Sequence, residues 1–123
     1  MRIWLASVLL LASCSIRTDY DVDNMHSIAA VRRLIEIRTS QDAYRSERGR
    51  YAIDFAELNP NLGKPRAGYA FRMTAQSDGY TVHADPVTRL LRRAARNFYL
   101  DQNGEIRESY SGKPATAQSP KIR

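Results

Sequence analysis

Few side chains suited to catalysis occur in this chain of 123 residues. It has two histidines, His26 and His83, and one cysteine, Cys14. Neither histidine is flanked by a cluster of Asp, Glu or Cys residues, which a metal site or a catalytic triad would favour. The Gly-x-Ser-x-Gly turn, the His-Glu-x-x-His pattern and a glycine-rich phosphate loop are all missing from the sequence. We therefore expect both histidines to face solvent and the protein not to be an enzyme.

Calcium binding is a second candidate chemistry, at the sequence Asp-Gln-Asn-Gly-Glu of residues 101–105. An EF-hand loop places glycine at its sixth position and glutamate at its twelfth. Counted from Asp101, a glycine comes fourth and Gly112 comes twelfth, so the loop pattern is not met. A hairpin turn at Asn103-Gly104 explains the segment as well. Asp101 is the single calcium ligand that the sequence suggests, and no other cofactor is indicated.

A basic segment at residues 88–97, Thr-Arg-Leu-Leu-Arg-Arg-Ala-Ala-Arg-Asn, is the third candidate. On a helix its arginines recur at spacings of three and four and form one basic face: Arg89, Arg92, Arg93 and Arg96. Guanidinium groups bind phosphates bidentately, so nucleic acid, lipopolysaccharide or anionic lipid head groups are conceivable partners. No aromatic side chains interleave with the arginines, which argues against stacking on bases. A solvated connection between two hairpins is the alternative.

The cysteine stands at the end of an apolar N-terminal segment. Arg2 precedes about ten apolar residues, 3–12, which are too few to span a bilayer and are typical of a signal-peptide core. The sequence Leu11-Ala12-Ser13-Cys14 resembles the lipobox of bacterial lipoproteins. That resemblance implies a signal peptide at 1–13, acyl chains such as palmitate on Cys14, and a protein held on a membrane of the bacterial cell envelope. Two or more acyl chains hold a protein firmly, whereas one is marginal.

The mature chain then divides into a tether, a helix and two hairpins. Residues 14–20 are expected to form a lipidated polar tether, and 111–123 a disordered tail with few apolar residues. Between them, apolar residues spaced by three and four predict a helix over about 21–48: Ile28, Val31, Leu34, Ile35, Ile37 and Tyr44. Such a helix is about 40 Å long, so its first turns are expected to project beyond the domain.

The second half of the domain has the alternation typical of strands. Apolar and polar residues alternate over 69–75 and again over 80–84, with a hairpin turn expected at Asp78-Gly79. A second hairpin is expected over 97–107, and a short helix at Asp54–Glu57, which has the spacing of a capping box. The sequence therefore predicts an α+β fold, in which a long N-terminal helix packs on an antiparallel sheet of about four strands.

Three segments resemble type IV pilin-like proteins and type II secretion pseudopilins. They are the helix with Val31, Leu34, Ile37, Thr39, Gln41 and Tyr44, the hairpin sequence GYAFRMTAQSDGYTVHADPVT, and the hairpin sequence NFYLDQNGEIR. The last follows a Phe-Tyr-x-Asp-x-x-Gly-x-Ile-Arg pattern. The resemblance covers about residues 25–110 and implies a pilin-like domain at 21–110. Some pseudopilins bind calcium near their C-terminal loops, which is the context in which Asp101 is a candidate.

One feature of pilins is missing from the sequence. Pilins begin with an apolar helix of about 20 residues that carries a glutamate and forms both membrane anchor and filament core, whereas this chain has the lipobox instead. We therefore expect a non-enzymatic envelope lipoprotein that displays a pilin-like domain, linked to type II secretion or pilus-like machinery. The alternative is an anion-binding module that acts through residues 89–96.

Overall fold

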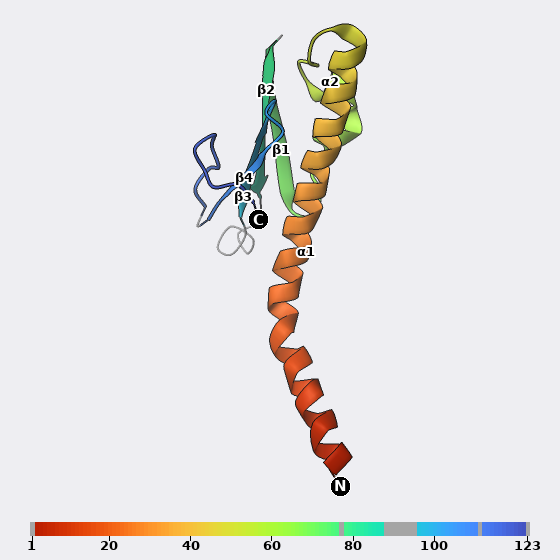
Figure 1. Cartoon of the computed structure of the whole chain (residues 1–123), viewed down its shortest axis with the longest axis vertical. Helices are drawn as coiled ribbons and strands as arrows, with labels where there is room; N and C mark the ends of the chain where they lie inside the picture. Colours follow the sequence, from red (N-terminus) through yellow and green to blue (C-terminus); the bar gives the residue numbers. More distant parts are fainter. Residues whose placement is uncertain (1, 77, 88–95, 111, 123) are drawn as a thin grey trace.

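The computed structural model describes residues 2–76, 78–87, 96–110 and 112–122, with side chains from Met25 onward. A long helix precedes two very short helices and four strands, and the strands form one antiparallel sheet in the order β1-β2-β3-β4 (Figure 1). The elements are α1 (Arg2–Arg48), α2 (Phe55–Leu58), the 3₁₀ helix η1 (Pro60–Gly63), β1 (Tyr69–Gln76), β2 (Gly79–Pro86), β3 (Asn97–Asp101) and β4 (Ile106–Ser109). The predicted α+β fold is confirmed.

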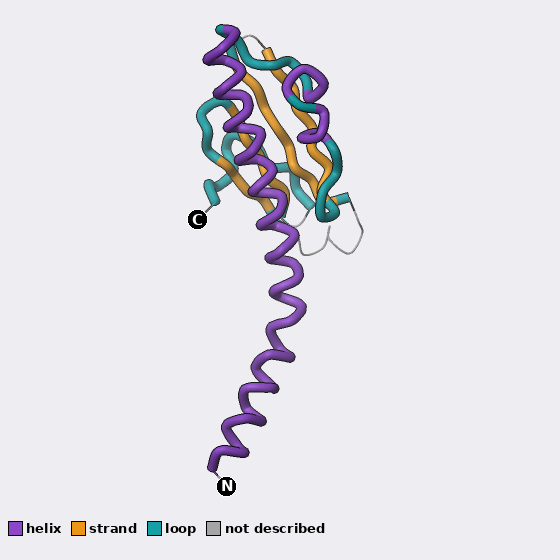
Figure 2. The backbone as a smooth tube through the Cα atoms, turned by 90° about the vertical axis from the view of Figure 1, so that its right-hand side faces the viewer, coloured by secondary structure: helices purple, strands orange, loops and turns teal. Residues whose placement is uncertain are grey.

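Helix α1 has a packed half and a projecting half. Its C-terminal half lies against one face of the sheet, and its N-terminal half extends past the sheet (Figures 1 and 2). The helix begins at Arg2 rather than near residue 21, so residues 14–20, expected to form a tether, are helical. The physical reason is that no proline or glycine occurs before Gly49 to break the helix.

The hydrophobic core lies between α1 and the sheet. On the helix, the side chains facing the sheet recur at heptad-like spacing: Ala30, Leu34, Ile37 and Gln41, all fully buried. They meet the apolar side of the alternating strands, where Tyr69 and Phe98 pack with ring centroids 5.9 Å apart. Hairpins alone are only marginally stable in water. The packing of this helix stripe on the two hairpins therefore stabilises the sheet.

The first hairpin differs from the expectation at Gly79. Gly79 pairs with Gln76 and is the first residue of β2, not a turn residue. Gly79 does not have the positive φ that the expected Asp78-Gly79 turn requires.

The second hairpin has its turn at the expected place. Gly104 has φ +81°, and its N–H donates to the carbonyl of Asp101 at 2.9 Å. The short helix α2 is also confirmed, because the Asp54 side chain caps it by accepting from the N–H of Glu57 at 2.8 Å.

Residues 112–122 pack against the domain, although the sequence led us to expect a disordered tail at 111–123. The N–H of Glu108 donates to the carbonyl of Pro120, and the N–H of Ile122 donates to the carbonyl of Ile106. Lys121 adds an ion pair with Glu105 at 2.8 Å. Two of the few apolar residues of this segment contribute to packing: Ala115 is fully buried, and Ile122 packs against the core. Residues 120–122 therefore lie along β4, where Lys121 forms an isolated β-bridge with Arg107.

Candidate functional site

Cys14, the predicted lipidation residue, lies in the N-terminal half of α1. Its side chain is outside the part of the chain whose side chains are described. At 1.5 Å per residue, the helix from Cys14 to Met25 is about 16 Å long. Among the residues searched, those that the structure describes, no helix is long and apolar enough to cross a membrane.

Three residues of the predicted basic face, Arg89, Arg92 and Arg93, lie outside the described residues. The fourth, Arg96, is part of the folded domain. Its guanidinium forms an ion pair with Glu108 at 2.8 Å and lies 5.4 Å from the centre of the Phe98 ring. Its carbonyl accepts a hydrogen bond from the Tyr69 hydroxyl at 2.8 Å. Arg96 is therefore already engaged by the sheet and is not a free anion ligand.

This difference within the basic segment predicts two separate outcomes. Replacing Arg96 by Gln is expected to destabilise the domain by about 1 kcal/mol, because the buried Glu108 loses its cation. Replacing Arg89, Arg92 and Arg93 by Gln together is expected to leave the melting temperature within about 2 °C of wild type. Thermal melts of both variants test this prediction.

The triple variant also tests the anion-binding alternative. If that alternative holds, wild-type protein binds DNA or lipopolysaccharide and the triple variant does not. The wild-type binding should also weaken steeply with added salt, because binding releases counterions. Wild-type protein that binds neither polyanion at low salt would contradict the alternative.

Asp101, the suggested calcium ligand, is a turn residue in the structure. Its two carboxylate oxygens accept from the N–H of Asn103 at 3.0 Å and from the hydroxyl of Tyr99 at 3.2 Å. The residue is 8% exposed. No group of three or more His, Cys, Asp or Glu residues that could hold a metal ion occurs within the described ranges. The carboxylate thus shapes the β3–β4 turn.

The two histidines do not face solvent as expected, since both are half-buried. His26 Nδ1 donates to the carbonyl of Ala67 at 2.7 Å and so joins α1 to the loop before β1. That loop needs support because Ala67 has φ +52°, a conformation that is costly for a residue with a Cβ.

His83, on β2, makes an edge-on contact with Tyr99, with ring centroids 5.5 Å apart. Its buried Nδ1 has no hydrogen-bond partner in the described part of the chain. Burial of the ring and the nearby charge of Arg72 lower the pKa of His83, and Asp85 opposes them. His83 is therefore favoured in its neutral form and is a structural residue of the sheet.

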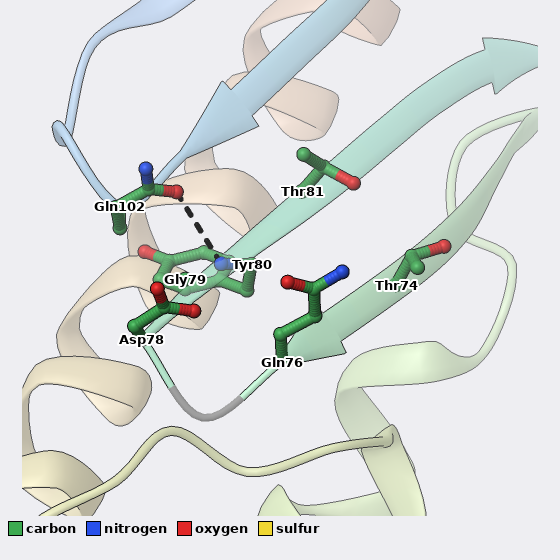
Figure 3. A pocket seen from close by; sticks show the side chains of 7 residues that line it. All are labelled: Thr74, Gln76, Asp78, Gly79, Tyr80, Thr81 and Gln102. Carbon is green, nitrogen blue, oxygen red and sulfur yellow. Dashed lines mark hydrogen bonds between the residues drawn. The ribbon is translucent and has the colours of Figure 1, made fainter.

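A hollow of about 330 Å³ lies at the tip of the β1–β2 hairpin (Figure 3). Gln102 closes one side and accepts from the N–H of Tyr80 at 3.3 Å. Burial raises the pKa of the Tyr80 hydroxyl, which has no hydrogen-bond partner among the described residues. The other side chains that line the hollow are hydroxyls, an amide and the single carboxylate of Asp78, so its described lining holds no acid–base pair for catalysis.

Two buried polar residues of α1 that the charge and motif analysis missed organise the loop between α1 and β1. Arg33 Nη1 donates to the carbonyls of Asn61, Leu62 and Lys64 at 3.0, 2.9 and 3.1 Å. Gln41 accepts from the N–H of Ala52 and donates to its carbonyl. Their positions in the sequence could have identified them as buried, because both residues fall on or beside the stripe of α1 that faces the sheet.

No protein-family model matches this chain, and no curated protein sequence matches it.

Proposed function

We propose that this protein is a cell-envelope lipoprotein that displays a pilin-like domain and acts by binding other proteins. Acyl chains on Cys14 would hold it to the membrane, and its partners would belong to type II secretion or pilus-like machinery. The observation that carries the proposal is the division of α1 into a half packed on a four-stranded antiparallel sheet and a half that projects beyond it (Figures 1 and 2). This order of elements is the one that the resemblance implies.

The composition of the projecting half supports anchorage by lipid rather than by an apolar stem. Removal of residues 1–13 would leave Cys14 at the start of α1, followed by the polar stretch Ser-Ile-Arg-Thr-Asp-Tyr-Asp-Val-Asp-Asn. A stretch with three aspartates and an arginine does not enter the hydrocarbon core, because each charge there is costly. The stretch would therefore act as a stalk in water between the lipid and the domain.

Deletion of the gene in its own host tests the proposed role. We expect secretion of type II substrates or assembly of pili to fall at least several-fold, and a plasmid copy of the wild-type gene to restore it. A Cys14→Ser copy is expected to fail, because the domain would not be held beside its partners, whereas a Thr18→Ser copy serves as the matched control. Unchanged secretion and unchanged piliation in the deletion strain would contradict the proposed role.

A further inference from the structure

Helix α1 carries a second, largely apolar stripe that the rest of the domain covers only in part. Ile28, Val31, Ile35 and Arg38 follow one another at spacings of three and four residues. At 3.6 residues per turn, they lie about 110° round the helix from the stripe that faces the sheet. Ile28 and Ile35 are 44% and 39% exposed, which is high for isoleucine.

This second stripe forms one wall of a groove. The opposite wall comes from β3, β4 and the C-terminal segment. One hollow, of about 330 Å³, lies among Ile28, Val31, Phe98 and Ile122. The next, of about 260 Å³, lies among Ile35, Ile106 and Ile122. Ile122 lines both hollows, so they lie next to each other along α1, and we call the two together the α1–β4 groove.

The rim of the α1–β4 groove is positively charged. Arg32 is exposed and makes no ion pair with any described residue. Arg38 donates to an uncharged group, the carbonyl of Gly104, at 2.7 Å. Two further cations on the rim, Arg96 and Lys121, are paired with carboxylates. The positive charge that no described carboxylate neutralises therefore comes from Arg32 and Arg38 on α1, next to the exposed isoleucines.

We propose that the α1–β4 groove binds an amphipathic helix of a partner protein, with Asp or Glu residues on both sides of its apolar stripe. Ile28 and Ile35 are two helical turns apart, about 10 Å, which matches the spacing of anchoring side chains at positions i and i+7 of a bound helix. Acidic residues beside those anchors would meet Arg32 and Arg38. A second copy of this chain fits less well, because its α1 would bring the same arginines toward a positive rim.

The inference names a partner class for the proposed interaction role and rests on it. It is tested with the full chain in phosphatidylcholine nanodiscs and two fluorescent helical peptides of about 18 residues. Both peptides have leucine at the heptad a and d positions, and they differ in carrying Glu or Lys at the flanking positions. Fluorescence anisotropy measures their binding, with empty nanodiscs as the blank. Anisotropy reports on peptide binding to the groove, whereas lipid on Cys14 is measured separately. A negative result in one measurement therefore does not contradict the hypothesis that the other one tests.

We expect the Glu peptide to bind at least about tenfold more tightly than the Lys peptide. The double variant Ile28→Gln/Ile35→Gln is expected to weaken that binding at least about tenfold, while Ile53→Gln, at an exposed isoleucine outside the groove, leaves it unchanged. Arg32→Glu is expected to reverse the preference toward the Lys peptide, and Arg48→Glu is its charge-matched control.

Several results would overturn the proposal. They are equal binding of the two peptides, binding unaffected by the Ile28→Gln/Ile35→Gln change, and displacement of the Glu peptide by a fatty acid, which would assign the groove to lipid. Self-association of the wild type that is lost in the same double variant, measured by sedimentation velocity, would instead assign the groove to a second copy.

Discussion

Replacing Cys14 by serine is expected to abolish lipid attachment and to leave residues 1–13 uncleaved. A thiol reacts through its thiolate, whereas the serine hydroxyl has no comparable nucleophile at neutral pH. In wild-type protein we expect the mature chain to begin at residue 14 with acyl chains on the cysteine. Mass spectrometry of the N-terminal peptide, from protein extracted from membranes, measures both outcomes. Ser15→Ala is the matched control and is expected to be processed and lipidated like wild type.

Washing membranes with concentrated salt provides an independent check on the anchor. Ions screen surface charges but do not weaken the burial of acyl chains in the bilayer. Wild-type protein should therefore stay with the membranes after the wash. Recovery of a wild-type N-terminal peptide with an unmodified Cys14 thiol would refute the anchor and the localisation that follows from it.

The second large effect is expected at Gln41, which is fully buried beneath the loop that follows α1. Its side chain accepts from the N–H of Ala52 at 2.8 Å and donates to the carbonyl of Ala52 at 3.0 Å. Ala52 is also fully buried, so water cannot replace either bond. Gln41→Met keeps the volume and removes both bonds, and we expect it to lower the free energy of unfolding by about 3 kcal/mol. In a domain of this size that corresponds to a melting temperature lower by roughly 15 °C.

Thr39→Met provides the control, because Thr39 lies two positions away on the exposed side of α1. Its effect is expected to stay within about 0.5 kcal/mol. Differential scanning calorimetry of the two variants separates the contribution of the Ala52 bonds from the introduction of a methionine. A Gln41→Met protein as stable as wild type would mean that the loop relaxes and finds other partners for Ala52.

The fold was predictable where local chemistry determines it. The spacing of three and four residues in the set that includes Leu34 and Ile37 predicts a helix, and alternation predicts strands with one buried side. At Gly104 the positive φ demands glycine, so that turn could be placed to the residue. At the first hairpin, Gly79 was read as a turn residue although it is the first residue of β2, because the pairing register depends on both strands.

The remaining features depend on contacts between distant residues, which composition does not reveal. Residues 112–122 are mostly polar, yet Ala115 and Ile122 find apolar neighbours, and the backbone pairs with β4. Arg96 was indistinguishable in sequence from the other arginines of its segment, and its ion pair with Glu108 depends on a strand that comes later in the chain. The α1–β4 groove likewise exists only because β4 and Ile122 approach α1 from far along the chain.

The pairing of residues 120–122 with β4 has a consequence for how copies of the domain behave when crowded. An open strand edge offers N–H and C=O groups on which another chain can pair, and long open edges lead to aggregation. On β4 the N–H of Glu108 and the carbonyl of Ile106 are already bonded to Pro120 and Ile122. A lipid anchor would concentrate the protein in two dimensions, where encounters between neighbours are frequent. Covering β4 removes one route by which these neighbours could fuse their sheets, and it leaves the helix side of the domain free for selective contacts.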